Sequence, residues 1–185
     1  MSVEPALRQR TVALVGLMGA GKSSIGRRLA NALGLPFVDA DEEIEKAAAR
    51  SISDIFEELG EAAFRDGERR VIARLLEDPP HVLATGGGAF MIESTRDLIR
   101  RRAISVWLKT DIEVLLRRVE RRNDRPLLRQ GDPREVLERL AAERYPIYAL
   151  ADITVESGEA AHQATVDAIL AALRARVAAE EAPSL

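Results

Sequence analysis

The sequence predicts an α/β fold in which helices cover both faces of a parallel sheet. Short apolar runs alternate with stretches of helical periodicity along the whole chain. The short runs are almost continuously apolar and β-branched, as strands buried on both faces are. The length of 185 residues, with 46% hydrophobic and 31% charged residues, is typical of one globular domain with its own core. We therefore expect residues 1–185 to form a single domain.

Five apolar runs are expected to be the strands of this sheet. In chain order they are residues 11–17, 36–40, 81–84, 103–109 and 153–157. Helices are expected where apolar residues recur three or four positions apart. These stretches are residues 22–34, 41–50, 51–60, 61–77, 94–101, 111–122 and 133–151, with a last helix from Glu159. Ser51 or Ser53 is a candidate N-cap, and Gly34 is a candidate helix stop.

Composition and charge exclude several classes of function. A formal net charge of −3 provides no basic surface for nucleic acid, and the absence of cysteine excludes disulfides and thiolate chemistry. His81 and His162 are isolated, so a Ser-His-Asp triad is not expected. No apolar run approaches the ~18 residues that span a bilayer. Residues 1–10 read as a short frayed leader without the apolar segment of a signal peptide, so we expect a cytoplasmic protein.

A phosphate-binding loop is the strongest motif in the chain. Gly16–Ser23 reads GLMGAGKS and matches G-x-x-x-x-G-K-[ST] at every fixed position, between an expected strand and an expected helix. Glycines let backbone N–H groups surround phosphate oxygens, and the helix N-terminus adds positive potential. Lys22 would reach the β- and γ-phosphates, and the hydroxyl of Ser23 would ligate Mg²⁺.

The alternative is a glycine-rich turn that happens to contain Lys-Ser. Lysine use argues against this alternative, because Lys occurs at positions 22, 46 and 109 alone in a chain rich in arginine. A compact ammonium group fits inside such a loop where a guanidinium group would not. We therefore predict that the chain binds a nucleoside triphosphate.

Two aspartates one residue apart follow the second expected strand. One interpretation is a helix start, with Asp41 as the N-cap and Glu42 and Glu43 in the first turn. The other is that Asp39 and Asp41 take part in the chemistry. Alternation of side chains along a strand would place both carboxylates on the same side.

The third expected strand ends without the aspartate that many phosphate-loop enzymes use to hold the metal. Residues 81–84 run instead into Thr85–Gly88, so the acidic partner of the metal is expected at the end of strand 36–40. A guanine-reading Asn-Lys-x-Asp segment is also absent from the sequence, which argues against a GTPase. The three glycines are either a mobile loop or a substrate-binding wall of backbone N–H groups.

Three arginines stand out from the many that must be solvated. Arg65 follows Phe64 on the apolar side of a helix, where it is either a surface arginine lying along apolar neighbours or a ligand-binding group. Arg125 lies in a loop stiffened by proline, from which a cation could close over a triphosphate. Arg144 lies near a helix end just before a proline.

From about residue 11 to about residue 169, the ordered set of motifs resembles the shikimate kinase family. The matching segments are GLMGAGKSSIGRRLA, FVDAD, SISDIFEELGEAAFR, TGGG, NDRPLL and ERYPIY. This resemblance implies the adenylate-kinase-like fold of the P-loop NTPases, with a five-stranded parallel sheet in the order 2-3-1-4-5. It also implies a substrate-binding helical region at about 41–75 and a lid at about 121–133. The family transfers the γ-phosphoryl of ATP to the 3-hydroxyl of shikimate in aromatic amino-acid biosynthesis.

The resemblance also implies a set of site residues. Substrate would be bound by Asp41, Arg65, Gly86, Gly87, Gly88 and Arg144. ATP would be bound by Gly19, Ala20, Gly21, Lys22, Ser23, Ser24, Arg118 and Arg125. Lys22, Asp41 and Arg125 would be catalytic, and one Mg²⁺ ion would be held by Ser23 and Asp39. The chemistry agrees, because two arginines suit a carboxylate, while an aspartate and backbone donors suit hydroxyls.

Two other functions use the same loop. A gluconate-type or other small-metabolite kinase would share it, but would not be expected to carry the later motifs together. A non-catalytic ATP-binding protein would leave the arginines and the triple glycine without a ligand. We expect ATP and a small acceptor as partners, no nucleic acid or membrane, and a monomer.

Overall fold

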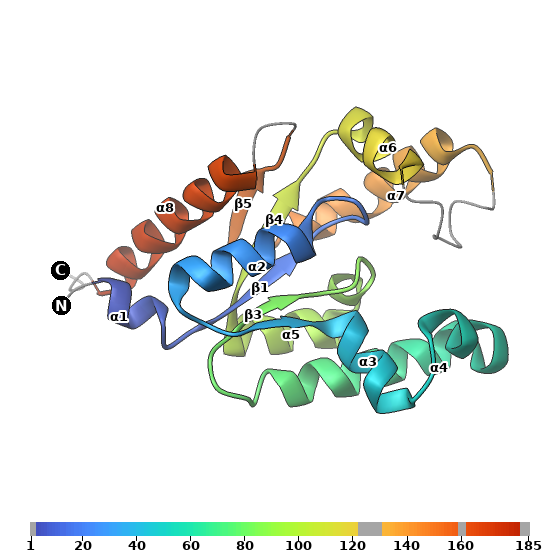
Figure 1. Cartoon of the computed structure of the whole chain (residues 1–185), viewed down its shortest axis with the longest axis horizontal. Coiled ribbons are helices and arrows are strands. Elements are labelled where there is room, and N and C mark those ends of the chain that lie inside the picture. The colour runs from blue at the N-terminus through green and yellow to red at the C-terminus, as the bar shows by residue number, and fades with distance from the viewer. Residues whose placement is uncertain (1–2, 122–130, 159–161, 182–185) are drawn as a thin grey trace.

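The computed structural model describes residues 3–121, 131–158 and 162–181 and contains a five-stranded parallel sheet (Figure 1). Its strands are β1 (Thr11–Val15), β2 (Phe37–Asp39), β3 (Val82–Ala84), β4 (Ala103–Lys109) and β5 (Ile153–Glu156). The described helices are α1 (Val3–Leu7), α2 (Lys22–Leu33), α3 (Ala40–Ala48), α4 (Ile52–Leu75), the 3₁₀ helix η1 (Ala89–Met91), α5 (Glu93–Arg102), α6 (Ile112–Glu120), α7 (Pro133–Tyr148) and α8 (His162–Glu181). The strand order is β2-β3-β1-β4-β5, which confirms the predicted fold class and order.

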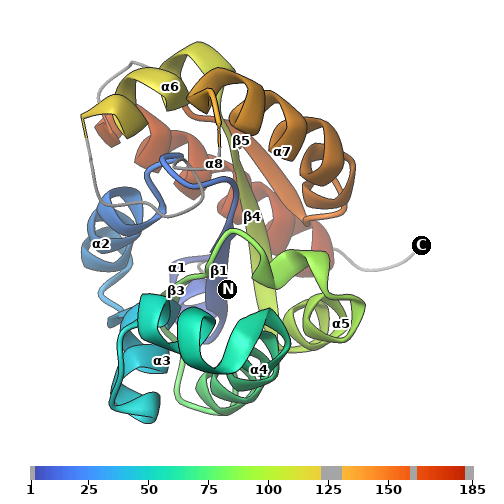
Figure 2. The same ribbon diagram turned by 90° about the vertical axis from the view of Figure 1, so that its right-hand side faces the viewer.

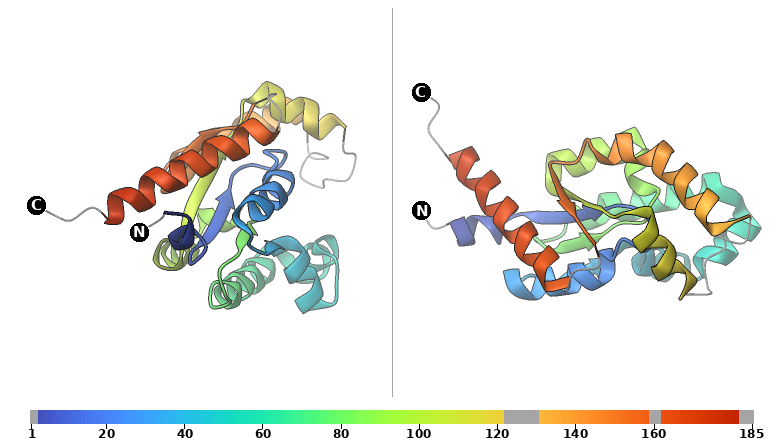
Figure 3. Two further views of the ribbon diagram at one scale, coloured as in Figure 1. Left: turned by 60° about the vertical axis from the view of Figure 1, so that its left-hand side comes forward. Right: turned by 90° about the horizontal axis from the view of Figure 1, so that it is seen from above.

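Helices cover the sheet on both faces (Figure 3). The α2 and α8 helices pack against each other and against the sheet on one face, whereas α5 packs on β4 from the other. Strands β1, β3 and β4 are almost completely buried, which explains why their sequences are continuous apolar runs instead of alternating ones. In the described residues, no helix combines the length and apolar character needed to cross a membrane.

The strand register brings three chain segments to one edge of the sheet. Asp39 at the end of β2 pairs with Ala84 at the end of β3, and Ala84 pairs in turn with Leu14 of β1. Because all strands run in the same direction, the segments that follow them leave the sheet side by side. The phosphate loop, the start of α3 and the triple glycine therefore meet at the carboxyl ends of the strands, where ligands bind in open α/β sheets.

Local capping explains the boundaries of the helices that follow β2. Ser51 caps α4, because its hydroxyl accepts a hydrogen bond from the Asp54 N–H at 3.1 Å. The helices expected at 51–60 and 61–77 form one element, Ile52–Leu75, with a kink at Gly60. Gly60 has φ of 82°, a conformation that side chains disfavour, which explains why the break falls there.

The first residues differ from the prediction. Instead of a frayed leader, Val3–Leu7 form the short helix α1, which packs against α8. The side chain of Leu7 is buried in the core and supplies the apolar contact that holds this helix in place.

Candidate active site

A cleft of about 520 Å³ lies at the carboxyl ends of the strands. It is lined by Met18, Gly19, Gly21, Lys22, Ser23, Ser24, Asp39, Asp41, Ala84, Thr85, Gly86, Gly87, Arg118, Val119, Arg121 and His162. Most of the residues predicted to bind ATP, metal and substrate are therefore together in one cavity. Figure 2 looks toward this end of the molecule, where α3 and α4 lie on one side and α6 and α7 on the other.

The phosphate loop leads from β1 into the first turn of α2. Gly21, the residue before the helix, has φ of 96°, which explains why a glycine is needed at that position. The Lys22 ammonium folds back into the loop, where its Nζ donates to the carbonyl oxygens of Gly16 at 2.7 Å and Leu17 at 2.9 Å. The loop therefore combines a helix N-terminus with a cation, which is the arrangement that binds phosphate.

Ser23 and Asp39 lie in contact, although they are 16 residues apart. The Ser23 hydroxyl donates to Asp39 Oδ2 at 2.7 Å, while Asp39 Oδ1 accepts from the backbone N–H of Asp41 at 3.0 Å. Asp39 is thus the N-cap of α3, and the interpretation of Asp41 as the N-cap was wrong. The physical reason is that β2 ends at Asp39, whose backbone is still extended, whereas Asp41 already lies in the first helical turn.

The strand alternation argument for Asp41 was wrong for the same reason, because Asp41 is helical. Even so, both carboxylates line the cleft. Both residues therefore reach the cleft through the turn from β2 into α3, and not through strand alternation.

The pair Ser23 and Asp39 suits a magnesium ion. A hydroxyl and a carboxylate are hard oxygen ligands, and Mg²⁺ is usually held by one or two protein groups together with substrate phosphates and water. Within the part of the chain that the structure describes, no group of three or more His, Cys, Asp or Glu side chains could form a complete metal site by itself. The oxygen pair thus fits an ion that is bound mainly by a nucleotide.

The triple glycine lies against acidic side chains of α3 and α4. A Cβ atom on Gly86 would lie 2.9 Å from Oε1 of Glu68 and 3.0 Å from Oδ1 of Asp41. Real Cβ atoms essentially never approach so closely, so any side chain at position 86 would displace these carboxylates. Glycine at this position therefore allows both carboxylates to reach the backbone.

The next two glycines lie against the two predicted carboxylate-binding arginines. A Cβ on Gly87 would lie 3.3 Å from the guanidinium of Arg144, and a Cβ on Gly88 would overlap the guanidinium of Arg65. The three glycines are therefore packed among the side chains that were predicted to bind substrate. This packing favours the interpretation as a binding wall over the interpretation as a mobile loop.

Sequence reasoning missed Glu68, which lies one helical turn after Arg65. Its side chain is 1% exposed, and Oε2 accepts from Arg65 at 2.7 Å. The other oxygen, Oε1, is buried and has no hydrogen-bond partner among the described residues. Burial raises the pKa of Glu68, against the lowering effect of Arg65. The spacing of three residues between the acid and the arginine was the available signal.

Arg118 connects the phosphate loop to the loop after β5. Its guanidinium donates to the carbonyl oxygens of Gly19 at 3.0 Å, Ala20 at 3.2 Å and Gly158 at 2.8 Å. His162 lines the same end of the cleft. Burial lowers the pKa of His162, with a further contribution from Arg118 and Arg28, so its imidazole is neutral at pH 7. Arg118 therefore has the position expected for a nucleotide-binding residue.

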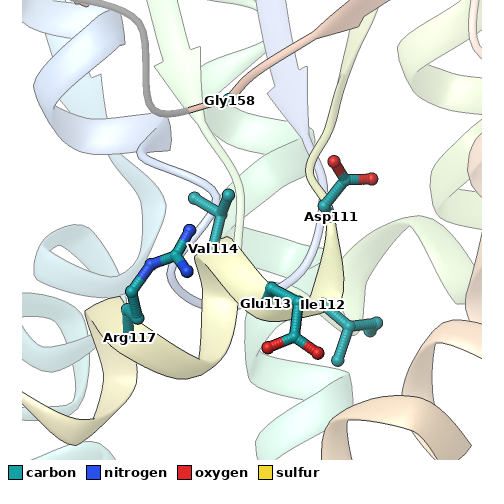
Figure 4. Close-up of a pocket in the computed structure, with 6 residues that line it drawn as sticks. All are labelled: Asp111, Ile112, Glu113, Val114, Arg117 and Gly158. Carbon is teal, nitrogen blue, oxygen red and sulfur yellow. The ribbon is translucent and has the colours of Figure 1, made fainter.

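A second hollow, of about 500 Å³, lies at the start of α6 (Figure 4). It is lined by Asp111, Ile112, Glu113, Val114, Arg117 and Gly158. The carboxylate of Glu113 already accepts two hydrogen bonds from the Arg134 guanidinium, at 2.5 Å and 3.0 Å. None of the residues predicted to bind substrate lines this hollow, so we assign the site to the first cleft.

Two predictions fall largely outside the described residues. Arg125 and most of the lid expected at about 121–133 belong to residues 122–130, which the structure does not describe. Of the predicted lid, Arg121 lines the cleft, and Pro133 begins α7 after the N-cap Asp132.

Comparison with known proteins gives one consistent family. The family model for shikimate kinase matches residues 18–174. The shikimate kinase of Caulobacter vibrioides strain NA1000 is 66% identical over 168 residues, which cover 91% of this chain and 84% of that protein. The shikimate kinase of Rhodopseudomonas palustris is 61% identical over 168 residues, which cover 91% of this chain and 83% of that protein.

A solved structure agrees with these relatives. The shikimate kinase from Acinetobacter baumannii in complex with shikimate has a TM-score of 0.88 and 38% identity, covering 94% of this chain and 98% of that one. The family match covers well over half of the chain and includes most of the phosphate loop, the triple glycine, Arg65 and Arg144. The chain therefore belongs to the shikimate kinase family, and it is an enzyme of the kinase class.

Proposed function

We propose that this enzyme transfers the γ-phosphoryl group of ATP to the 3-hydroxyl of shikimate, giving shikimate 3-phosphate and ADP in aromatic amino-acid biosynthesis. One observation carries the proposal: the phosphate loop and Asp41 line a single cleft, with Arg65 and Arg144 packed against the glycines that follow β3. Family membership supports it, as does the related Acinetobacter baumannii enzyme in complex with shikimate.

On the nucleotide side, the phosphate loop holds the triphosphate. The backbone N–H groups of residues 19–24 surround the phosphate oxygens, and Lys22 releases its loop carbonyls to neutralise the transferring group. Arg118 lines the cleft and contacts the carbonyl oxygens of Gly19 and Gly158, which supports a role in binding ATP. The family resemblance also implies that Arg125, which lies outside the described residues, binds the triphosphate.

Ser23 and Asp39 would hold one Mg²⁺ ion that arrives with ATP. When bound, this ion supplies charge neutralisation and alignment of the β- and γ-phosphates. The observed contact between the hydroxyl and the carboxylate supports the assignment, because the two oxygens lie 2.7 Å apart and both residues line the cleft.

On the acceptor side, Arg65 and Arg144 bind the shikimate carboxylate and Asp41 binds the hydroxyl that is phosphorylated. A guanidinium group has five N–H donors, so Arg65 can bind Glu68 and a ligand carboxylate at the same time. Asp41 orients the acceptor hydroxyl and takes its proton, a modest contribution in a loose phosphoryl-transfer transition state. Backbone N–H groups of Gly86, Gly87 and Gly88 complete the wall.

A coupled ADP-release assay tests the proposal in four reactions that differ in the acceptor. The acceptors are shikimate, gluconate and nucleoside monophosphates, and the fourth reaction contains none. We expect ADP release that depends on shikimate, and a product with phosphate on the 3-hydroxyl by ³¹P NMR. Release with gluconate alone would point to another metabolite kinase. Equal release in all four reactions would mean that ATP is hydrolysed without an acceptor.

We further propose that residues 1–185 act as one kinase domain and as a monomer in the cytoplasm, where ATP is available. The single sheet and its continuous hydrophobic core support one domain. Light scattering of the purified protein with and without ATP measures the oligomeric state, and a dimer mass would contradict the monomer.

A further inference from the structure

The buried hydroxyl of Tyr148 contacts the triple glycine, Gly86–Gly88, which we call the substrate wall. Tyr148 is the last residue of α7, and its side chain is fully buried. Its hydroxyl donates a hydrogen bond to the carbonyl oxygen of Gly87, the middle residue of the triple glycine. Since β3 and α7 are far apart in the sequence, this bond ties the wall to a distant helix.

The same helix carries a predicted substrate-binding arginine. Arg144 lies four residues before Tyr148, so both side chains leave α7 on one face. The Arg144 guanidinium lies 3.3 Å from the position of a Cβ on Gly87, and the Tyr148 hydroxyl contacts the same residue's carbonyl. One face of α7 therefore contacts Gly87 through both a cation and a hydroxyl donor.

The ring of Tyr148 is held rigidly by an aromatic cluster. Its centroid lies 5.9 Å from that of Trp107, 6.4 Å from that of Tyr145 and 6.5 Å from that of Phe90. Burial raises the pKa of Tyr148 to about 12, so the phenol keeps its proton and remains a donor at physiological pH. The hydroxyl is a buried donor that lies close to the charged side chains of Arg144 and Arg65, both of which act against the rise in its pKa.

A fixed donor matters here because glycine backbones are flexible. Three consecutive glycines have the largest conformational freedom of any tripeptide, and ordering them on ligand binding would weaken affinity. The peptide group is planar, so holding the Gly87 carbonyl toward Tyr148 directs the N–H of Gly88 to the opposite side. The bond therefore sets the direction of a backbone donor in the wall before substrate arrives.

We propose that Tyr148 is a positioning residue for the acceptor substrate, acting through the Gly87 carbonyl and not by direct contact. This inference rests on the proposed function, since it assumes that the triple glycine binds shikimate. Removing the hydroxyl should raise the KM for shikimate and leave the KM for ATP nearly unchanged, because the phosphate loop, although it packs against Gly87 through Gly16 and Met18, is held by its own hydrogen bonds from Lys22.

Tyr148→Phe tests this proposal, with Tyr145→Phe as a matched control. Tyr145 belongs to the same helix and aromatic cluster, but its hydroxyl donates to the Thr110 carbonyl, away from the glycines. For Tyr148→Phe we expect the KM for shikimate to rise about tenfold, the loss expected for one buried hydrogen bond, and the KM for ATP to change less than about twofold. For Tyr145→Phe both constants should stay near those of the wild type.

Other outcomes remain distinguishable. If the wild type does not phosphorylate shikimate, the proposed function fails. If the wild type is active but Tyr148→Phe has the wild-type KM for shikimate, or raises the KM for both substrates equally, the positioning role is overturned. Calorimetric titration of folded Tyr148→Phe with shikimate separates weaker binding from instability, and the emission of Trp107 reports whether the aromatic cluster keeps its packing.

Discussion

The nucleotide side and the acceptor side of the cleft are built in opposite ways. On the nucleotide side, one continuous segment forms the loop and the start of α2, and the Lys22 charge is satisfied by the carbonyl oxygens of Gly16 and Leu17. On the acceptor side, α3, α4, the triple glycine and α7 contribute from separate parts of the chain. There the charges of Arg65 and Glu68 satisfy each other, with one carboxylate oxygen left over.

This difference in construction follows from the two ligands: the nucleotide side binds a phosphate group that all nucleotides share, whereas the acceptor side must select one acceptor. A phosphate loop can be contiguous because the phosphate group is the same in every nucleotide, and backbone N–H groups suffice to bind it. An acceptor with a carboxylate and several hydroxyls needs charged groups at fixed positions, which only the folded chain brings together. Substitutions on the two sides should therefore separate the kinetic constants for ATP from those for shikimate.

The largest effect is expected on the nucleotide side, from Lys22→Met. Removing the cation that neutralises the transferring phosphoryl group should lower kcat/KM by about a thousandfold. Fold stability should change little, because the lost hydrogen bonds are to loop carbonyls beside the cleft. Steady-state kinetics and thermal denaturation measure the two effects.

Lys46→Met is the control for this change. Lys46 is 69% exposed and pairs with Glu43 on the surface of α3. Its removal should leave kcat/KM within about twofold of the wild type, since exposed ion pairs contribute little. A similar loss in both variants would show that the loss of any lysine is enough, and would contradict the specific role of Lys22.

On the acceptor side, Asp41→Asn should lower turnover by about a hundredfold, the usual contribution of a positioned acid or base. ATP affinity should stay close to that of the wild type, because Asp41 contacts the triple glycine and Asp39 is the residue beside Ser23. ATP titration by calorimetry and single-turnover kinetics measure the two quantities. Equal losses in turnover and ATP affinity would contradict the assignment of Asp41 to the acceptor.

The contrast between the nucleotide side and the acceptor side also explains which features could be predicted from the sequence. The fold and the phosphate loop were predictable because the apolar runs and the loop are local patterns. Asp39 was correctly placed near Ser23, whereas Asp41 was given a strand position that it does not have, because the boundary between β2 and α3 depends on a cap. Glu68 was missed because its spacing from Arg65 signals only a possible ion pair, and nothing local marks a glutamate as buried. Its burial follows from the approach of Gly86, which only the fold reveals.

Gly88→Ala should give an intermediate effect that is confined to shikimate. The added Cβ would overlap the Arg65 guanidinium, so Arg65 must move away from its position beside Glu68. We expect the KM for shikimate to rise about tenfold or more, the loss of one charge-assisted hydrogen bond, with an unchanged KM for ATP.

Gly67→Ala provides the comparison for that variant. Gly67 lies within α4, and a Cβ there would meet no atom within 4 Å. Alanine should therefore leave both KM values unchanged and raise the stability of the helix by up to about 1 kcal/mol. If Gly67→Ala weakened shikimate binding as much as Gly88→Ala does, the close packing of the wall would not be the cause.

The smallest expected effect concerns stability and pH, through Glu68→Gln. Burial raises the pKa of Glu68 above its ordinary value of 4.5, so the folded protein keeps a proton that the unfolded chain has lost. Wild-type stability should thus fall as the pH rises from about 4.5 through the raised pKa, and level off above it. A glutamine does not titrate, so the melting temperature of Glu68→Gln relative to the wild type should rise over the same window.

Glu61→Gln isolates the role of burial in this effect. Glu61 also faces Arg65, at 3.7 Å, but it is 71% exposed. Its replacement should leave the melting temperature close to that of the wild type, because exposed ion pairs contribute little to stability. A change of about 1 kcal/mol moves the melting temperature of a chain of this size by about 2–4 °C, which is measurable. If the melting temperature of Glu68→Gln depended on pH in the same way as that of the wild type, the buried carboxylate would not titrate with folding, and Arg65 alone would set its charge on the acceptor side.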